Sequence, residues 1–237
     1  MLTVHRVSRL FQEGKAGFHH IDMQLTKGEV VGVLGTSGCG KSTLLRVLSG
    51  LDPQYEGTVT TDAVHQEEAF GMMFQEPRLM PWLNVIDNIT FGTKKRTKQK
   101  EAEALLKTVG LNGFEHHYPK DLSGGMAQRA AIARSLLHQP EILLLDEPFS
   151  ALDAFTKMQL QDLLLSIWER HETTTLLVTH DIDEALYLCD RIVIMRGQPG
   201  RVESEITIEQ PKPRKRGDAY LAGLKEQILQ ELDFTKV

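Results

Sequence analysis

The sequence predicts an α/β fold in which a parallel sheet carries helices on both faces, with a small antiparallel β part and an inserted helical subdomain. Two observations predict the sheet: short aliphatic runs recur along the chain, and helical segments separate most of them. A third predicts the insertion, because residues 76–138 show a loop and helical segments where further strands would otherwise follow. The length of 237 residues suits one large domain with such an inserted part.

The first part of the chain supplies strands and one helix. Some of its segments alternate apolar and polar side chains, which predicts strands with one exposed face. Others are continuously aliphatic, which predicts buried strands. The predicted elements are strands at 2–11, 21–25, 29–35, 56–60 and 69–75 and a helix at 41–51.

The inserted part opens with the loop EPRLMPW, and the core resumes after it. Helices are predicted at 84–91, 97–109, 126–138, 154–171 and 181–189, and strands at 141–147, 173–180 and 191–196. Leu221, Leu224, Ile228 and Leu232 recur at helical spacing and predict a final amphipathic helix that packs back on the body. We expect a single domain over 1–237, with a core of 1–75 and 139–237 and a helical subdomain of 76–138.

Composition excludes several classes of protein. The net charge of −5 disfavours a nucleic-acid binder, and no apolar run approaches the roughly 20 residues needed to cross a bilayer. The first residues are too short and polar for a signal peptide, so we expect a cytoplasmic chain. Cys39 and Cys189 are interpreted as free thiols, with Cys39 a small filler rather than a regulatory thiol. The basic run PKPRKR at 211–216 is interpreted as a solvated linker.

A phosphate-binding loop follows the strand at 29–35. GTSGCGKS fits the pattern G-x-x-x-x-G-K-[ST], and a helix follows it, which is the context the motif requires. Its glycines let backbone N–H groups face the phosphates, Lys41 neutralises the β and γ oxygens, and the Ser42 hydroxyl ligates Mg²⁺. The predicted nucleotide-binding residues of the loop are Gly35, Thr36, Ser37, Gly38, Cys39, Gly40, Lys41, Ser42 and Thr43.

Two acidic residues end the aliphatic strand EILLLDEP. A buried parallel strand carries Asp146 and Glu147 to the carboxyl edge of the sheet, where ligands of such sheets bind. Adjacent strand residues point in opposite directions, so we predict different roles for the two carboxylates. Asp146 suits the outer ligand shell of Mg²⁺, and Glu147 suits the base that polarises an attacking water.

A second glycine turn lies in LSGGMAQRAAIARSLL at 122–137, and with it the chain resembles the ATP-binding subunit of an ABC transporter over nearly its whole length. The resemblance implies a P-loop NTPase core of RecA-like type. Further positions match the family's motifs in order: Gln75 the Q-loop, residues 150–153 the D-loop with Asp153, and His180 the switch histidine. Phe11 stands where the family places an aromatic that stacks on adenine. Met126 departs from the usual glutamine, and we assign it no ligand role.

The resemblance implies a mechanism for the two glycine turns. Two subunits pack head to tail as a two-fold homodimer, and Ser123, Gly124 and Gly125 of one cap the γ-phosphate of ATP held by the other. It implies that Glu147, His180, Gln75 and Lys41 are catalytic, with Ser42, Gln75 and Asp146 around Mg²⁺. Asp153 is predicted to contact nucleotide.

The resemblance also implies partners. We expect transmembrane permease subunits to bind near Met80, Pro81 and Trp82, a solute-binding protein to act indirectly, and the chain to sit on the inner face of the membrane. EPRLMPWLNVIDNI at 76–89 resembles the nitrate/sulfonate/taurine group of importers, whose relatives include importers of thiamine precursors. The alternatives are core packing for Trp82, a non-transport scaffold ATPase for the protein, and a small-molecule kinase, which would leave LSGG and His180 without a role.

Overall fold

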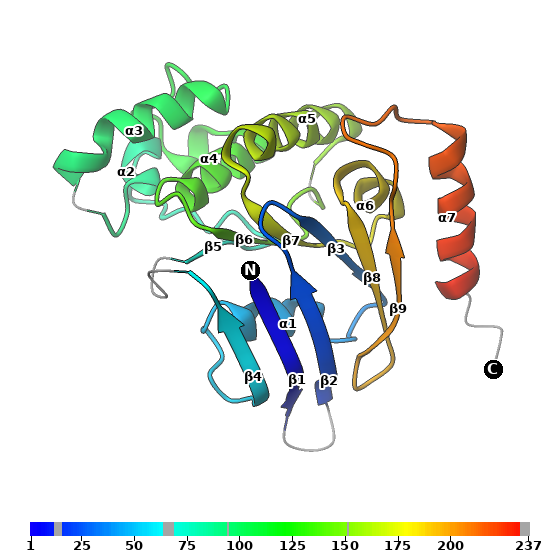
Figure 1. Ribbon diagram of the computed structural model, residues 1–237. Coiled ribbons are helices and arrows are strands. Elements are labelled where there is room, and N and C mark those ends of the chain that lie inside the picture. Colours follow the sequence, from blue (N-terminus) through cyan, green and yellow to red (C-terminus); the bar gives the residue numbers. More distant parts are fainter. Residues whose placement is uncertain (12–15, 64–68, 94, 151, 233–237) are drawn as a thin grey trace. The chain divides into compact units, whose positions relative to one another are not determined.

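The computed structural model describes residues 1–237 apart from 12–15, 64–68, 94, 151 and 233–237 (Figure 1). Contacts divide the chain into two compact units, Met1–Asp62 with Thr174–Val237 and Ala63–Thr173. The α/β class and the small antiparallel sheet are as predicted, and the larger sheet is mixed. Among the described residues, no helix combines the length and apolar character that a membrane crossing requires.

The small antiparallel sheet belongs to the first unit. Its central strand β1 (Leu2–Leu10) lies between β2 (Ala16–Leu25) and β4 (Glu56–Thr61). Leu2 pairs with Leu25 on one side and with Thr61 on the other. The strand predicted at 21–25 begins earlier, because Phe18 pairs with Arg9 and Ala16 with Leu10 of β1, beyond a register shift at the HH pair that breaks the apolar alternation.

The strands of the larger sheet that belong to the first unit are arranged in the order β7-β3-β8-β9. Strand β3 (Val30–Gly35) runs parallel to β7 (Thr174–Val178) and to β8 (Arg191–Arg196), whereas β9 (Arg201–Thr207) is antiparallel to β8. Strand β9 was not predicted, because RVESEIT places polar side chains on its exposed face and only Ile206 is buried. The sheet is consequently mixed rather than wholly parallel.

The described residues of the first unit also form the helices α1 (Lys41–Leu48), α6 (Ile182–Leu188) and α7 (Ala219–Leu232). Helix α7 packs against α6, and its Leu221 and Ile228 are buried. Lys225 Nζ on α7 lies 2.6 Å from Asp183 Oδ2 on α6. This arrangement confirms the amphipathic final helix and its packing on the body.

Arg214 corrects the interpretation of PKPRKR as a solvated linker. Its side chain is only 4% exposed, and burial lowers the pKa of its guanidinium. The guanidinium donates to the Leu186 carbonyl at 2.8 Å and to the Cys189 carbonyl at 2.6 Å. Leu186 lies in the last turn of α6, and Cys189 is its C-cap. Arg214 therefore caps the C-terminus of α6, where unpaired carbonyls and the helix dipole favour a cation.

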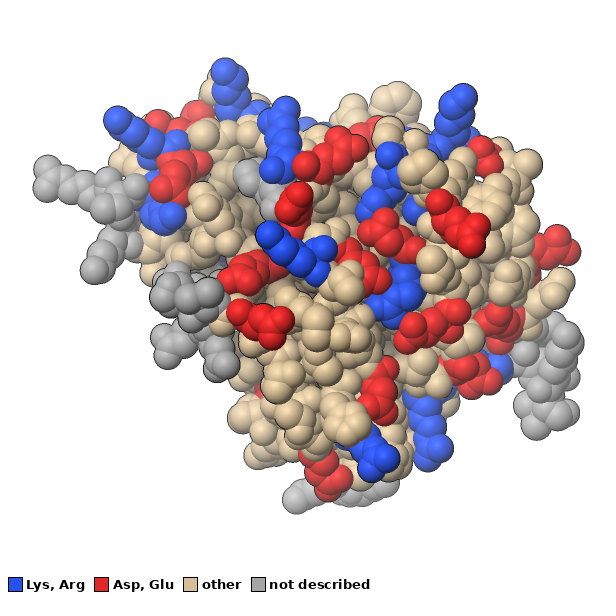
Figure 2. Space-filling view, viewed as in Figure 1, with Lys and Arg blue, Asp and Glu red and all other residues tan. Residues whose placement is uncertain are grey.

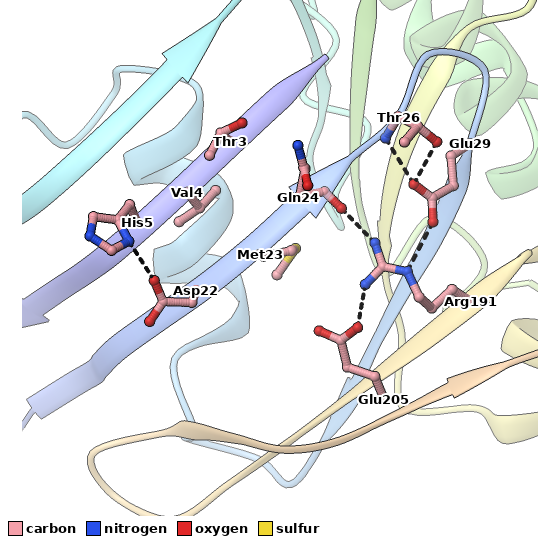
Figure 3. Close-up of a pocket in the computed structure, with 10 residues that line it drawn as sticks. All are labelled: Thr3, Val4, His5, Asp22, Met23, Gln24, Thr26, Glu29, Arg191 and Glu205. Carbon is pink, nitrogen blue, oxygen red and sulfur yellow. Dashed lines mark hydrogen bonds and ion pairs between the residues drawn. The ribbon is translucent and has the colours of Figure 1, made fainter.

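A second arginine ties strands together beside a hollow of about 570 Å³ (Figure 3). Arg191 donates to Glu29 at 2.9 Å, to Glu205 at 2.6 Å and to the Gln24 carbonyl at 2.5 Å. Burial lowers the pKa of Arg191, but its bonds to the two carboxylates outweigh burial, so the pKa lies above its ordinary value. These groups satisfy one another and join β2, β8 and β9 to the start of β3.

The second unit pairs two parallel strands with a helical core. Strand β5 (Phe70–Met73) pairs with β6 (Ile142–Asp146), placing Met73 opposite Leu145. The helices are α2 (Val85–Ile89), α3 (Lys95–Thr108), α4 (Gly124–Leu136) and α5 (Ala154–His171). Buried apolar side chains from α2, α3 and α4 form one cluster. The observed helices agree with those predicted to within three residues, and the subdomain bounds of 76 and 138 stay a prediction.

Candidate functional site

The phosphate-binding loop connects β3 to α1 in the first unit, as its motif predicted. Gly40 is the N-cap of α1 and adopts φ +92°, a left-handed conformation that costs glycine little. A Cβ at Gly40 would lie 2.1 Å from the Gly17 carbonyl oxygen, so no larger residue fits. The start of α1 thus presents its first backbone N–H groups at the end of the loop.

Lys41 lies across this loop. Its side chain is buried, and Nζ donates to the carbonyls of Gly35 at 2.8 Å and Thr36 at 3.0 Å. The loop's own carbonyls hold the ammonium where a phosphate oxygen could replace them. Cys39 is fully buried, and burial raises the pKa of its thiol, which favours the filler interpretation over a reactive one.

His180 follows β7, whose neighbour β3 leads into the phosphate loop. The Thr179 N–H donates to the Val33 carbonyl at 3.2 Å, so the ends of the two strands are joined. The Thr179 hydroxyl also contacts the buried Glu184 carboxylate at 2.5 Å. These bonds fix the backbone on which His180 is carried to the same edge of the sheet as the loop.

Phe11 follows β1 in the first unit, and its ring is 42% exposed. A Cβ on Gly17 would lie 3.1 Å from Phe11 Cε2 and 3.2 Å from Thr43 Cγ2. One short piece of β2 thus touches both the aromatic ring and the first turn of α1. This is a suitable position for an aromatic contact to a base whose phosphates occupy the loop.

Gln75 and Glu147 are brought together in the second unit. They follow the neighbouring parallel strands β5 and β6, and Gln75 Nε2 donates to Glu147 Oε2 at 3.3 Å. Asp146 is the last residue of β6 and is only 6% exposed. Glu147 adopts φ +45°, a strained conformation for a residue with a Cβ, and such strain concentrates at functional sites.

The second glycine turn begins α4. Ser123 is the N-cap, and its hydroxyl accepts from the Met126 N–H at 3.3 Å, leaving its own O–H to donate elsewhere. The helix begins at Gly124, earlier than the predicted 126, because this cap places both glycines in the first turn. Met126 packs against the helical core, in keeping with its lack of an assigned ligand role.

Asp153 caps the next helix, α5. Its carboxylate accepts from the N–H groups of Phe155 and Thr156, both at 3.0 Å, and from the Thr156 hydroxyl at 2.6 Å. The Thr156 hydroxyl bond lowers the pKa of Asp153, with further lowering from the backbone donors. Asp153 therefore fixes the helix start beside the D-loop, whose Ala151 lies outside the described residues; its contact to nucleotide stays a prediction.

The sequence profile of the family described as "ABC transporter" matches residues 18–150. This chain belongs to the ABC transporter family. As an ABC ATPase it binds and hydrolyses ATP in support of transport.

Curated relatives of this ABC ATPase cover nearly the whole chain. An "aliphatic sulfonates import ATP-binding protein SsuB 2" of Pseudomonas syringae pv. tomato is 52% identical over 98% of each chain. The corresponding SsuB protein of Bacillus cereus is 44% identical, over 98% of this chain and 96% of its own.

Solved structures match the fold as well. A dimeric post-hydrolysis state of the ATP-binding cassette MJ0796 bound to ADP and Pi has a TM-score of 0.78 at 30% identity, covering 89% of this chain and 100% of that one. The neighbour cbiO1 from Clostridium perfringens, described as part of the ABC transporter complex cbiONQ, has a TM-score of 0.77 at 25% identity, covering 99% of this chain and 95% of that one.

Several residues that shape the ABC ATPase's second unit were not predicted to do so. Gln128 Nε2 donates to the Gln75 carbonyl at 3.1 Å, and Arg134 donates to the carbonyls of Arg78 and Pro77 at 2.9 and 2.7 Å. Both project from α4, so this helix holds the backbone of the Q-loop. Only the continuation of the LSGG motif hinted at Gln128, and no pattern indicated Arg134.

Proposed function

We propose that this chain is the ATP-hydrolysing subunit of a bacterial importer of aliphatic sulfonates. The observation that carries the proposal is the 52% identity to a curated sulfonate-import ATP-binding protein over 98% of both chains. Residues 76–89 resemble the broader nitrate, sulfonate and taurine group of importers, and within that group the match favours aliphatic sulfonates as the solute.

In this proposal the first unit binds the nucleotide. The triphosphate lies against the N–H groups of the loop and the start of α1, and Lys41 exchanges carbonyl partners for phosphate oxygens. Phe11 contacts the adenine. His180 donates a hydrogen bond to the γ-phosphate from the end of β7.

The second unit supplies the hydrolytic groups. Glu147 accepts the proton of the attacking water, and Gln75, hydrogen-bonded to it at 3.3 Å, orients that water and senses the γ-phosphate. A positioned base of this kind contributes about 10²–10⁴ in rate. The strained backbone of Glu147 supports this role, because such conformations cost stability and concentrate at functional sites.

The residues fit a magnesium ion by the chemistry of their donors. Ser42, Gln75 and Asp146 offer hydroxyl, amide and carboxylate oxygens, which are the ligands Mg²⁺ prefers. Asp146 is 6% exposed at the carboxyl end of β6, the edge at which ligands of such sheets bind. When bound, the ion neutralises charge on the β- and γ-phosphates.

The proposal includes a two-fold homodimer with composite sites. The cassette MJ0796, which matches this fold, has a dimeric structure bound to ADP and Pi. Ser123 and Gly124 are exposed at the start of α4, where backbone N–H groups lack helix partners. That surface can cap the γ-phosphate of a second subunit's ATP. Hydrolysis then removes the shared charge and opens the dimer.

The permease is proposed to bind at Met80–Trp82, with the chain peripheral to the membrane. Trp82 is 70% exposed, so its side chain is not part of a core. The buried Asn88 amide holds the loop beneath it: Oδ1 accepts from the Met80 N–H at 2.6 Å, and Nδ2 donates to the carbonyls of Met80 and Leu83 at 3.1 and 2.9 Å. An aromatic side chain on an ordered backbone is typical of an interface anchor.

The substrate is tested by growth. A source strain lacking this chain should fail to grow with an alkanesulfonate as its only sulfur source, yet grow on sulfate. The wild-type gene should restore growth and Glu147→Gln should not, because that variant binds ATP without a base. Undiminished growth of the deletion strain on the sulfonate would contradict the proposed substrate.

The transporter role is tested by capturing the tagged chain from detergent-solubilised membranes. Capture of only soluble partners would favour a scaffold ATPase.

The composite site is tested by oligomeric state. With saturating ATP and Mg²⁺, Glu147→Gln should elute as a dimer from a sizing column, because the γ-phosphate stays in place. Adding Ser123→Arg should return it to a monomer with unchanged ATP affinity. Equal loss of ATP binding by the monomer would show that Ser123 serves the subunit's own nucleotide.

A further inference from the structure

The Phe11 ring has a cation on one of its faces. The Arg9 guanidinium carbon lies 4.3 Å from the ring centroid, within the range of a cation–π contact (about 6 Å). Both residues come from the end of β1, two positions apart. Nothing in the ATPase mechanism derived above uses Arg9.

Arg9 is anchored on the side away from the ring. Its Nε donates to Asp52 Oδ2 at 2.7 Å, and Nη1 and Nη2 donate to the Leu10 carbonyl at 2.8 Å and to Gln54 Oε1 at 3.3 Å. The Arg9 and Asp52 side chains are 14% and 18% exposed. Asp52 is itself tied to the helix of the phosphate loop, because its N–H donates to the Arg46 carbonyl at 3.0 Å.

The chemistry of such a stack is directional. A cation over one face of an aromatic ring draws electron density toward itself, which improves stacking of an electron-rich base on the other face. The anchored guanidinium also limits the motion of a ring that is otherwise 42% exposed. An ordered ring loses less conformational freedom when a base binds.

We propose that Arg9 is a positioning residue for the nucleotide base: it backs Phe11 and favours a purine in a stack of guanidinium, phenyl ring and base. This inference rests on the proposed contact between Phe11 and adenine. It places the preference for purine over pyrimidine in the Arg9–Phe11–Asp52 set, apart from the phosphate-binding groups.

The test compares the affinities of the full chain for ATP, CTP and inorganic tripolyphosphate, measured by calorimetry without Mg²⁺ so that no hydrolysis occurs. Arg9→Met should weaken ATP by about three- to tenfold and lower the ATP/CTP preference, while tripolyphosphate binding stays constant. The ATP affinity of Arg9→Lys should lie between those of the wild type and Arg9→Met, because lysine keeps the charge without the planar group. Arg6→Met, an exposed arginine of the same strand, is the matched control and should change none of the three.

A double-mutant cycle separates this role from a general structural one. Arg9 acts through Phe11, so Arg9→Met should have little further effect in a Phe11→Ala chain. Multiplying effects, or equal losses for ATP and tripolyphosphate, would overturn the inference. If Arg9→Met does not fold, Asp52→Asn keeps the guanidinium but loosens it and should lower the ATP/CTP preference in the same direction; an unchanged preference would count against Arg9.

The outcomes also distinguish this inference from the function beneath it. If Phe11→Ala leaves ATP affinity unchanged, the proposed adenine contact is wrong, and so is the positioning role of Arg9 that depends on it. If Phe11→Ala weakens ATP but Arg9→Met leaves both ATP affinity and the ATP/CTP ratio at the wild-type value, the adenine contact stands and only the positioning role fails.

Discussion

Replacing Arg214 with methionine removes the cap of α6 while keeping an unbranched apolar stem. In the native chain three short bonds leave the guanidinium, to the carbonyls of Leu186 at 2.8 Å, Cys189 at 2.6 Å and Gln210 at 2.8 Å. Exchanging a buried ion pair for apolar residues can be neutral, because both charges then disappear. Here the partners are backbone carbonyls, which remain after the substitution.

The magnitude follows from those carbonyls. Each buried acceptor left without a donor costs about 1–3 kcal/mol. Part of this is offset, because burying the guanidinium is itself unfavourable, as its lowered pKa shows, and some carbonyls gain water. We expect a net loss of about 2–4 kcal/mol in the free energy of unfolding. For a chain of this length that corresponds to a fall in Tm of roughly 4–16 °C.

Far-ultraviolet circular dichroism during heating and urea denaturation measures the loss. Lys215→Met is the matched control: it is the next residue, exposed, and should stay within about 0.5 kcal/mol of wild type. The free energy of unfolding of Arg214→Lys should lie between those of the wild type and Arg214→Met, since an ammonium cannot reach three divergent carbonyls at once. An Arg214→Met protein as stable as the Lys215→Met control would refute the capping argument.

Three further predictions concern the packing and backbone of both units. Gly125→Ala should lower the free energy of unfolding by about 1–3 kcal/mol, because the new Cβ would lie 2.4 Å from Thr156 Cγ2. Thr156→Ser removes that methyl group and should restore part of the loss in urea denaturation; equal losses with and without Thr156→Ser would contradict the clash. Glu147→Gly should be more stable than Glu147→Ala by about 1 kcal/mol, because position 147 has φ +45°, and both should be inactive; an alanine variant of equal stability would argue against strain. Burial raises the pKa of Cys189 to about 12, so in the native protein at pH 8 its thiol should resist alkylation, followed by mass spectrometry, until denaturant is added; rapid labelling of the folded chain would contradict this.

Residues whose positions in the fold depend on local patterns could be predicted from the sequence. Lys41, Glu147 and His180 each stand at a strand end or helix start, where the aliphatic run or the glycine turn fixes their place. Strand β9 could not be found this way, because an edge strand with one buried isoleucine has almost no apolar signal.

Side chains that bind distant backbone leave no periodic trace. Arg214 sits in a basic run that has the composition of a linker, and only the folded chain shows that its guanidinium meets the end of α6. The pairing of Arg9 with Asp52 spans 43 positions. Such contacts depend on tertiary structure, which single-sequence patterns of charge do not encode.

Acidic and basic side chains are interspersed over the face shown in Figure 2. The tip of the loop at Trp82 offers an aromatic surface instead, with Trp82 70% exposed. The Asn88 amide bonds only main-chain atoms of the loop that carries this tip. Pro81 and Trp82 can therefore be exchanged for other side chains while the loop keeps its course. Under the proposal that the permease binds at this tip, a few substitutions there after gene duplication would give one copy a new membrane partner and leave its nucleotide site unchanged.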